Sequence, residues 1–423
     1  MIRRTPGRYP LPVLVLSILG LAALAAPAAS VAGSPKATVK VKTVAVGSLG
    51  NPSAAIVPFS DAIYQSCADA PTSGGPDCQE IGAVDYRYGI AQLEITVGQY
   101  VDFLNTVDPT GDDPDDLYTS TESSTAWPKY GQINFRGKSA DGKHYLVAHP
   151  EWADKPYGFA DFLRASRFVN SLQNGKLLAK KTSEGNGFKY TTYKVRLSRA
   201  YDSGMYDLRR DKRTGATRAE KKGFVVPSQD EWVKSAYFDP SGGGTLSYWK
   251  YPTNPGVFGE GETDAPTSST LDPSTGDVTN SATQPLATFH DSPLPAPSWC
   301  PSAVQPQSDC SSVNPFGIDP TTYAKLFVGS LGTVGQAGTR SPWGTLDQGG
   351  NAVEWTDTIT PPPSKRSRGR VWRRLHGGVP NSTAYQMWIS AVGLQPQDNK
   401  VYDTVYPWLG FRVGVIGNLN VSK

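Results

Sequence analysis

The chain has 423 residues, which is enough for one large domain or two small ones. It carries 41 Lys and Arg against 38 Asp and Glu, and three of the arginines lie within the first eight residues. Without those three the basic and acidic residues balance, so composition argues against wholesale nucleic-acid binding. The 43 Gly and 35 Pro residues predict plentiful loops and a low helix content.

Residues 1–32 have the pattern of a targeting segment. Arg3, Arg4 and Arg8 precede an apolar run from Leu11 to Leu24, and small residues follow as far as Gly33. The run is too short to span a bilayer, so we expect a cleaved signal peptide rather than a transmembrane anchor. This predicts a secreted protein, or one held in the periplasm or outside the cell.

The four cysteines form two local pairs, each in turn-prone sequence. An exported chain with an even cysteine count favours two short disulfides, Cys67–Cys78 and Cys300–Cys310. Metal binding is the weaker alternative, because neither pair has the CxxC spacing. Residues 33–81 are therefore expected to form an N-terminal strand, Thr38–Val46, and a linker with one disulfide loop.

A half-buried strand and a helix are expected next. Apolar or aromatic residues occupy every second position, at Val84, Tyr86, Tyr88 and Ile90, which is the period of a strand with one buried face. A helix should begin at Thr96, where Gln99 three residues later completes a capping box. The residues that share its apolar face are Tyr100, Phe103, Leu104 and Val107.

Two further helices are predicted downstream of an acidic loop and a hairpin around Ser139–Gly142. In the first, Phe162, Ala165, Val169 and Leu172 recur at helical spacing, and Asn174-Gly175 ends the pattern. In the second, Ser228 and Glu231 form a capping box, and Trp232 and Ala236 face inward. Between them, residues 176–222 are rich in Lys and Arg and should contain another hairpin. Residues 241–312 are rich in Gly, Ser, Thr and Pro and read as a long loop insertion.

The segment SPWGTLDQGGNAVEWTD, Ser341 to Asp357, combines a Gly-Gly-Asn turn with two carboxylates, Asp347 and Glu354. Gly349 and Gly350 are expected to take positive φ, which turns carbonyl oxygens inward. Oxygen-only cages of this kind suit a hard cation such as Ca²⁺. The alternative is a plain hydrogen-bonded turn over an aromatic core.

Several of these segments together resemble the sulfatase-modifying-factor, or formylglycine-generating-enzyme, domain family. The match rests on SPWGTLDQGGNAVEWTD followed by RRLHGG (Arg373 to Gly378) and GFRV (Gly410 to Val413). It extends upstream through VVPSQDEWVKSAYF, RFVNSLQNG and GIAQLEITVGQYVDFLN, and VGSLGNP resembles an entry motif of an exported branch. The resemblance implies one domain over 82–418, with the insertion at 241–312. Its fold would be irregular α+β, of the C-type-lectin-like kind.

The resemblance also implies two metal sites. The family's copper is held by two cysteines between Arg-Gly-Gly and Gly-Phe-Arg, but Val379 to Leu409 contains no cysteine, so copper is not expected here. Met387 is one thioether, and core packing explains it better. The family's structural Ca²⁺ site maps residue by residue onto Asp347, Gly350, Ala352 and Glu354.

Iron chemistry has only a weak candidate in the sequence. Non-haem iron needs two His and a carboxylate on one face, and His144, His149 and Glu151 have a suggestive order. On a strand, a five-residue spacing places the two rings on opposite faces, which favours surface histidines instead. His290 and His376 have no partner that the sequence identifies.

The sequence therefore favours an exported domain without oxidase activity that binds a glycan, a peptide or a protein partner, with abundant Tyr and Trp at its surface. Two alternatives stay open. One is an active family enzyme, either a formylglycine-type oxidase or a non-haem iron enzyme, with a divergent metal site. The other is a structural surface-assembly protein.

Overall fold

The computed structural model describes fifteen stretches of the chain. They are residues 36–58, 63–64, 78–125, 131–139, 141–209, 216–242, 247–253, 265–272, 275–280, 285–289, 331–362, 369–380, 382, 384–398 and 407–421. All belong to one compact unit, Ser34–Lys423. The predicted signal peptide, Cys67, His290, Cys300 and Cys310 lie outside the described residues.

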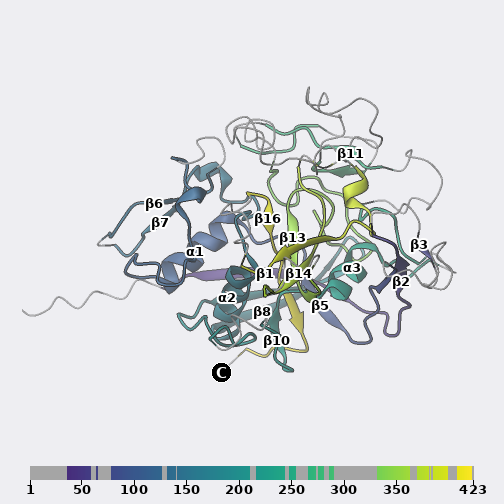
Figure 1. Ribbon diagram of the computed structural model, residues 1–423, viewed down its shortest axis with the longest axis horizontal. Coiled ribbons are helices and arrows are strands. Elements are labelled where there is room, and N and C mark those ends of the chain that lie inside the picture. Colours follow the sequence, from purple (N-terminus) through teal and green to yellow (C-terminus); the bar gives the residue numbers. More distant parts are fainter. Residues whose placement is uncertain are drawn as a thin grey trace, which may run out of the picture. The chain divides into compact units, whose positions relative to one another are not determined.

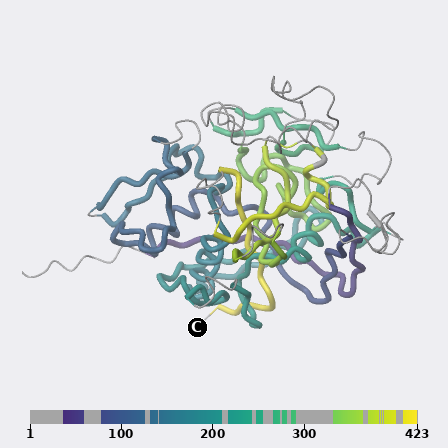
Figure 2. The backbone as a smooth tube through the Cα atoms, viewed as in Figure 1, coloured from purple at the N-terminus to yellow at the C-terminus, as the bar shows by residue number. Residues whose placement is uncertain are grey.

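A six-stranded antiparallel sheet joins the two ends of the described chain (Figures 1 and 2). Its order is β10 (Gly223–Val225), β17 (Gly414–Ile416), β5 (Tyr88–Ala91), β1 (Thr38–Val46), β9 (Phe188–Arg196) and β8 (Lys176–Gly185). The predicted strand Thr38–Val46 is confirmed as β1, and the hairpin expected within 176–222 is β8–β9. Because β1 and β17 both pair with β5, the first and last strands flank the same segment.

A second, four-stranded sheet carries the Gly-Gly-Asn segment. Its order is β15 (Gly393–Pro396), β14 (Trp372–His376), β13 (Val353–Thr360) and β16 (Leu409–Gly410). The smaller sheets are β3–β2–β4 (Ile63–Tyr64, Ala54–Ile56, Gln79–Ile81), β6–β7 (Ile133–Phe135, Tyr145–Val147) and β11–β12 (Thr267–Ser268, Leu286–Ala287). The hairpin predicted around Ser139–Gly142 is β6–β7.

The three predicted helices are present, and both predicted capping boxes are confirmed. Helix α1 (Val97–Val107) has the Thr96/Gln99 capping box, and α3 (Gln229–Tyr237) has the Ser228/Glu231 box. Helix α2 (Phe162–Gln173) is capped by Asp161. Short 3-10 turns are η2 (Ser120–Glu122), η3 (Pro150–Trp152) and η6 (Ala384–Met387). The described chain is therefore a mixed α+β structure with few helices, as the sequence predicts.

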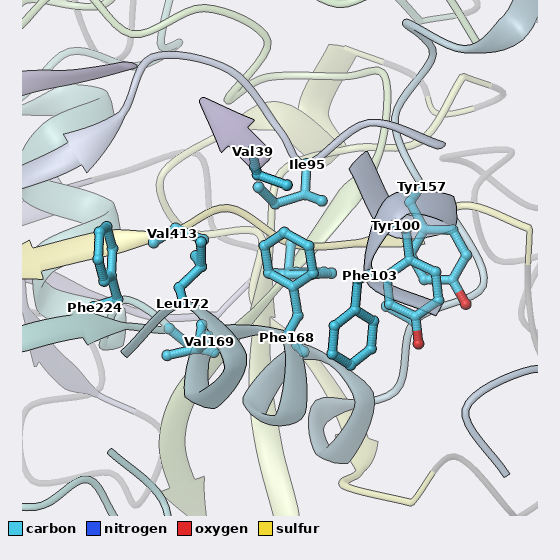
Figure 3. Packing of buried hydrophobic residues seen from close by; sticks show 14 of the residues in the cluster. Val39, Ile95, Tyr100, Phe103, Tyr157, Phe168, Val169, Leu172, Phe224 and Val413 are labelled. Atoms are coloured by element: carbon cyan, nitrogen blue, oxygen red, sulfur yellow. The ribbon is translucent and has the colours of Figure 1, made fainter. Parts of the chain in front are cut away.

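The largest apolar core lies between α1, α2 and the six-stranded sheet (Figure 3). The predicted apolar faces of both helices are buried in it, including Phe103 of α1 and Leu172 of α2. The rings of Tyr100 and Tyr157 stack at 3.7 Å between centroids. Phe168 packs edge-on against Phe103, which ties α2 to α1. Stacked and edge-on rings of this kind add to the free energy gained from burying their area.

One expectation about a single segment is wrong. The strand predicted by the alternation at 84–90 begins only at Tyr88, and Tyr86 is 40% exposed with its hydroxyl donating to Glu231. Arg373, in β14, is fully buried although it lies in a sequence rich in basic residues. Its guanidinium lies 3.4 Å from the centroid of the Phe162 ring, a cation–π contact that favours burial.

Candidate functional site

The Gly-Gly-Asn loop makes its turn at Gly350, as predicted, and also at Asp347 and Asn351, but not at Gly349. Positive φ occurs at Asp347 (58°), Gly350 (88°) and Asn351 (59°), and Gly349 has none. Gly350 is required for a second reason, because a Cβ there would lie 2.4 Å from the carbonyl oxygen of Thr288. Asp and Asn tolerate the left-handed conformation better than other side chains do.

Glu354 follows this loop at the start of β13 and forms a buried ion pair with Arg412. The Arg412 Nε donates to Glu354 Oε2 at 2.6 Å, and a terminal nitrogen donates to Oε1 at 2.5 Å. Trp232 Nε1, from α3, donates to the same Oε2 at 2.9 Å. Both ionic side chains are fully buried. This two-point geometry is the strongest arrangement available to an Arg–carboxylate pair.

Arg412 uses its remaining donors on backbone carbonyls. One terminal nitrogen reaches Ala91 and Gln92 at 3.0 and 3.3 Å, and the other reaches Leu346 at 3.1 Å. The Gly-Phe-Arg motif thus connects β5, the Gly-Gly-Asn loop and β13. Every nitrogen of this guanidinium therefore donates to a protein oxygen.

Glu94 is a site residue that the sequence analysis did not single out. Its carboxylate accepts from the Ala352 amide and from the Asn351 side chain, both at 3.1 Å. Burial raises the pKa of Glu94 well above its usual value, and the charges of Asp347 and Glu354 raise it further. The one sequence signal for Glu94 is its place in the LEIT motif, two residues before Thr96, the N-cap of α1.

Three buried carboxylates therefore face one buried guanidinium. Asp347 is 7% exposed, and burial raises its pKa to about 6. Its Oδ2 accepts the Gly335 amide at 2.5 Å, which opposes that increase only in part. An excess of buried negative charge is costly unless protons or a bound cation neutralise it.

The predicted calcium ligands, Asp347, Gly350, Ala352 and Glu354, stay a prediction. Within the described residues no three His, Cys, Asp or Glu side chains converge in a way that would hold a metal ion. The carbonyl oxygens of Gly350 and Ala352 receive no hydrogen bond from the described part of the chain. With Asp347 nearby, these oxygens are of the type Ca²⁺ prefers, whereas the Glu354 oxygens are already shared with Arg412.

The segment Val379–Leu409 buries both apolar and polar side chains in its described part, the polar ones being Ser382, Ser390 and Gln397. In the described part of Val379–Leu409, Met387, Ile389 and Val392 are buried. Met387 packs in a cluster with Tyr251, Ala287 and Phe289, which confirms its assignment to the core. Its carbonyl accepts the Tyr237 hydroxyl at 2.9 Å.

His376, directly before Gly377-Gly378, is buried beside this site. Its ring stacks on Trp232 at 5.1 Å between centroids, and neither ring nitrogen has a hydrogen-bond partner among the described residues. Burial, with a smaller contribution from the charge of Arg374, lowers the pKa of His376 to about 3. The imidazole is therefore neutral at physiological pH.

The residues considered for iron do not form a site in the structure. His144 is 2% exposed, and its ring nitrogens lie 2.9 and 3.0 Å from the carbonyls of Gly137 and Pro109. His149 is half-buried and lies 3.9 Å from Glu151. Of the four cysteines only Cys78 is described, and no described cysteine is a free thiol. Both disulfide pairings stay predictions.

No protein-family model matches the sequence, and no characterised protein sequence matches it. Among solved structures, the chain is similar to Treponema denticola variable protein 1, with 15% identity, a TM-score of 0.40, and 88% of this chain and 94% of that chain covered. It is similar to CarF, with 11% identity, a TM-score of 0.35, and 91% and 100% covered. It is also similar to PvdO from Pseudomonas aeruginosa, with 12% identity, a TM-score of 0.33, and 89% and 93% covered. Across the described residues, no helix has the length and apolar character needed to cross a membrane.

Proposed function

We propose that this chain is an exported domain of the sulfatase-modifying-factor type, with a C-type-lectin-like fold, that binds a partner and carries out no copper-dependent oxidation. The partner would be a glycan, a peptide or a protein. Support for the fold comes from the meeting of three motifs: Glu94 of LEIT, Glu354 of the Gly-Gly-Asn segment and Arg412 of Gly-Phe-Arg. Fold alone does not fix function, so the chemistry of the site decides between binding and catalysis.

The observation that carries the proposal is that Val379–Leu409 contains no cysteine and that Met387, in its described part, is buried. Copper(I) needs soft thiolate ligands, and this stretch contains no thiol. Its one soft atom is the sulfur of Met387, which is fully buried in an aromatic cluster. Such a residue stabilises the core, which supports a role other than copper-dependent oxidation.

A structural Ca²⁺ is part of the proposal. Asp347 and the carbonyls of Gly350 and Ala352 would hold it, with Glu354 contributing an oxygen that it also shares with Arg412. The ion would offset the excess of buried carboxylate charge described above. It would stabilise the native state and would not take part in a reaction.

The test uses the signal-free chain, purified and loaded with copper. It is incubated with a Cys-x-Pro-x-Arg peptide under oxygen, and mass spectrometry is used to look for the aldehyde. We expect none above a no-protein control, and an aldehyde would overturn the proposal. Metal analysis of the purified chain is the second arm: calcium alone supports a binding domain, whereas stoichiometric copper or iron contradicts it.

A further inference from the structure

One face of the six-stranded sheet carries a dense array of cations on β1, β9 and β8. The pairing register sets three rows across these strands: Thr38–Arg196–Lys176, Lys40–Lys194–Ala179 and Lys42–Thr192–Lys181. Cross-strand partners point to the same face, so these nine side chains form one patch. Strands lie about 4.8 Å apart and successive same-face residues about 6.8 Å, so the patch measures roughly 10 by 14 Å.

Six of the nine positions are Lys or Arg, and all six are exposed. We call this set the basic face; it consists of Lys40, Lys42, Lys176, Lys181, Lys194 and Arg196. None of the six forms an ion pair with any described carboxylate, and none of the nine positions is acidic. The opposite face of the same strands, with Val39, Val41 and Val195, packs into the main core.

Ordinary structural reasons do not account for this face. Lysines on an edge strand discourage edge-to-edge aggregation, which explains those of β8, since β8 is the edge. The same reasoning does not cover β1 and β9, which lie inside the sheet. Lys40 lies directly opposite Lys194, and Lys176 opposite Arg196. Like charges in direct opposition destabilise a sheet. Lys42 is offset by a cation–π contact, with its ammonium 4.1 Å from the centroid of the Tyr190 ring, but no ion pair among the described residues offsets the opposed pairs.

We propose that the basic face binds a linear anionic polysaccharide, carboxylated or sulfated. This inference rests on the proposed binding function and names its ligand class. The six cations match the repeated negative charge of such a polymer. Thr38 and Thr192 add hydroxyl groups within the rows, suited to hydrogen bonding with sugar hydroxyls.

The other anionic partners fit this face less well. Single-stranded nucleic acid is usually held by exposed aromatic rings, and Tyr190, the aromatic residue next to this face on β9, is buried. Binding to an anionic lipid surface is strengthened by apolar side chains that insert, and none of the nine positions carries a large apolar side chain. A second copy of this chain would place cations against cations.

Two variants remove half of the basic face each. The first is Lys40→Gln with Lys194→Gln and Arg196→Gln, and the second is Lys42→Gln with Lys176→Gln and Lys181→Gln. The control carries the same charge change at exposed lysines elsewhere, Lys143→Gln with Lys221→Gln and Lys222→Gln. Thermal melting shows that each variant is folded before binding is measured by calorimetry to polygalacturonate and to heparin, with neutral dextran as the uncharged comparison.

We expect the wild type to bind one or both polyanions and not dextran, with affinity that falls as salt rises. Each basic-face triple should weaken binding by roughly tenfold or more, while the control triple keeps it within about threefold. Equal losses in all three variants, or no binding to either polyanion, would overturn the inference. Tighter binding to phosphatidylserine vesicles or to an oligothymidine would overturn it as well. Failure here leaves the aldehyde assay unaffected, so the two proposals are tested separately.

Discussion

Replacing His376 by Phe should flatten the dependence of stability on pH below pH 6.5. The ring, at the end of β14, is 1% exposed and stacks on Trp232 of α3, and Phe preserves that stacking. Burial lowers the folded-state pKa of His376 to about 3, from an ordinary value of 6.5. Because the folded pKa is depressed, the unfolded chain takes up the proton first as pH falls. The stability is fully present above pH 6.5 and is lost progressively as pH decreases toward 3.

The magnitude follows from that interval. Each pH unit between the unfolded and folded pKa is worth about 1.4 kcal/mol. At pH 5 the His376 contribution should therefore be lower than at pH 8 by roughly 2 kcal/mol. Removing two ring nitrogens that lack partners should also spare a desolvation cost on the order of 1–3 kcal/mol, which favours the variant at every pH.

Urea unfolding of wild type and His376→Phe at pH 8, 6.5 and 5 measures both effects. Other groups titrate in this range, so the informative quantity is the difference between the two proteins at each pH. That difference should grow by roughly 2 kcal/mol from pH 8 to pH 5 in favour of the variant. A difference that stays constant with pH would show that the imidazole is not buried as described.

The remaining predictions concern the site and the cysteines. Chelator should lower the melting temperature of the wild type. The loss is equivalent to about 2.7 kcal/mol if calcium is present at 100 times its Kd, and Asp347→Asn should remove most of that sensitivity. Identical melting curves with and without chelator would count against the ion. Glu354→Gln should lower the unfolding free energy by roughly 3–5 kcal/mol even without calcium, because Arg412 loses its buried charge partner. A decrease in unfolding free energy below about 1 kcal/mol would contradict the ion pair. Non-reducing peptide mapping should find Cys67–Cys78 and Cys300–Cys310, each contributing on the order of 2–3 kcal/mol; free thiols or cross-pairing would refute the assignment.

The helices were predictable because their signals are local. The Thr96/Gln99 and Ser228/Glu231 boxes are read within four residues, and the apolar spacing of α1 and α2 follows from helix geometry. The strand predicted at 84–90 is longer than the observed β5, because the alternation of apolar residues continues beyond the residues that pair with neighbouring strands. Tyr86 leaves the sheet because its hydroxyl bonds to Glu231, a residue of α3. No local pattern contains that contact.

The centre of the site was only partly predictable for the same reason. Asp347, Gly350 and Glu354 lie within one short segment, so a motif brings them together. Arg412 reaches the carbonyl of Ala91, 321 positions away in the sequence, and this pairing can be read only in three dimensions. Glu94 likewise joins the site through the turn that Asn351 and Ala352 make.

The contacts of Arg412 show that the motifs behind the family resemblance have a structural role in this chain. The Arg412 guanidinium donates to Glu354 and to the backbone carbonyls of Ala91, Gln92 and Leu346. The motifs that suggest an oxidase family therefore act here to hold two sheets together. That structural role is complete without copper, and the same motifs would be needed in a binding domain or an enzyme alike. The residues that separate those two possibilities lie elsewhere, in the apolar filling around Met387 and on the exposed cations of β1, β9 and β8. Substitutions of those residues therefore test function, whereas substitutions within the motifs would mainly destabilise the fold.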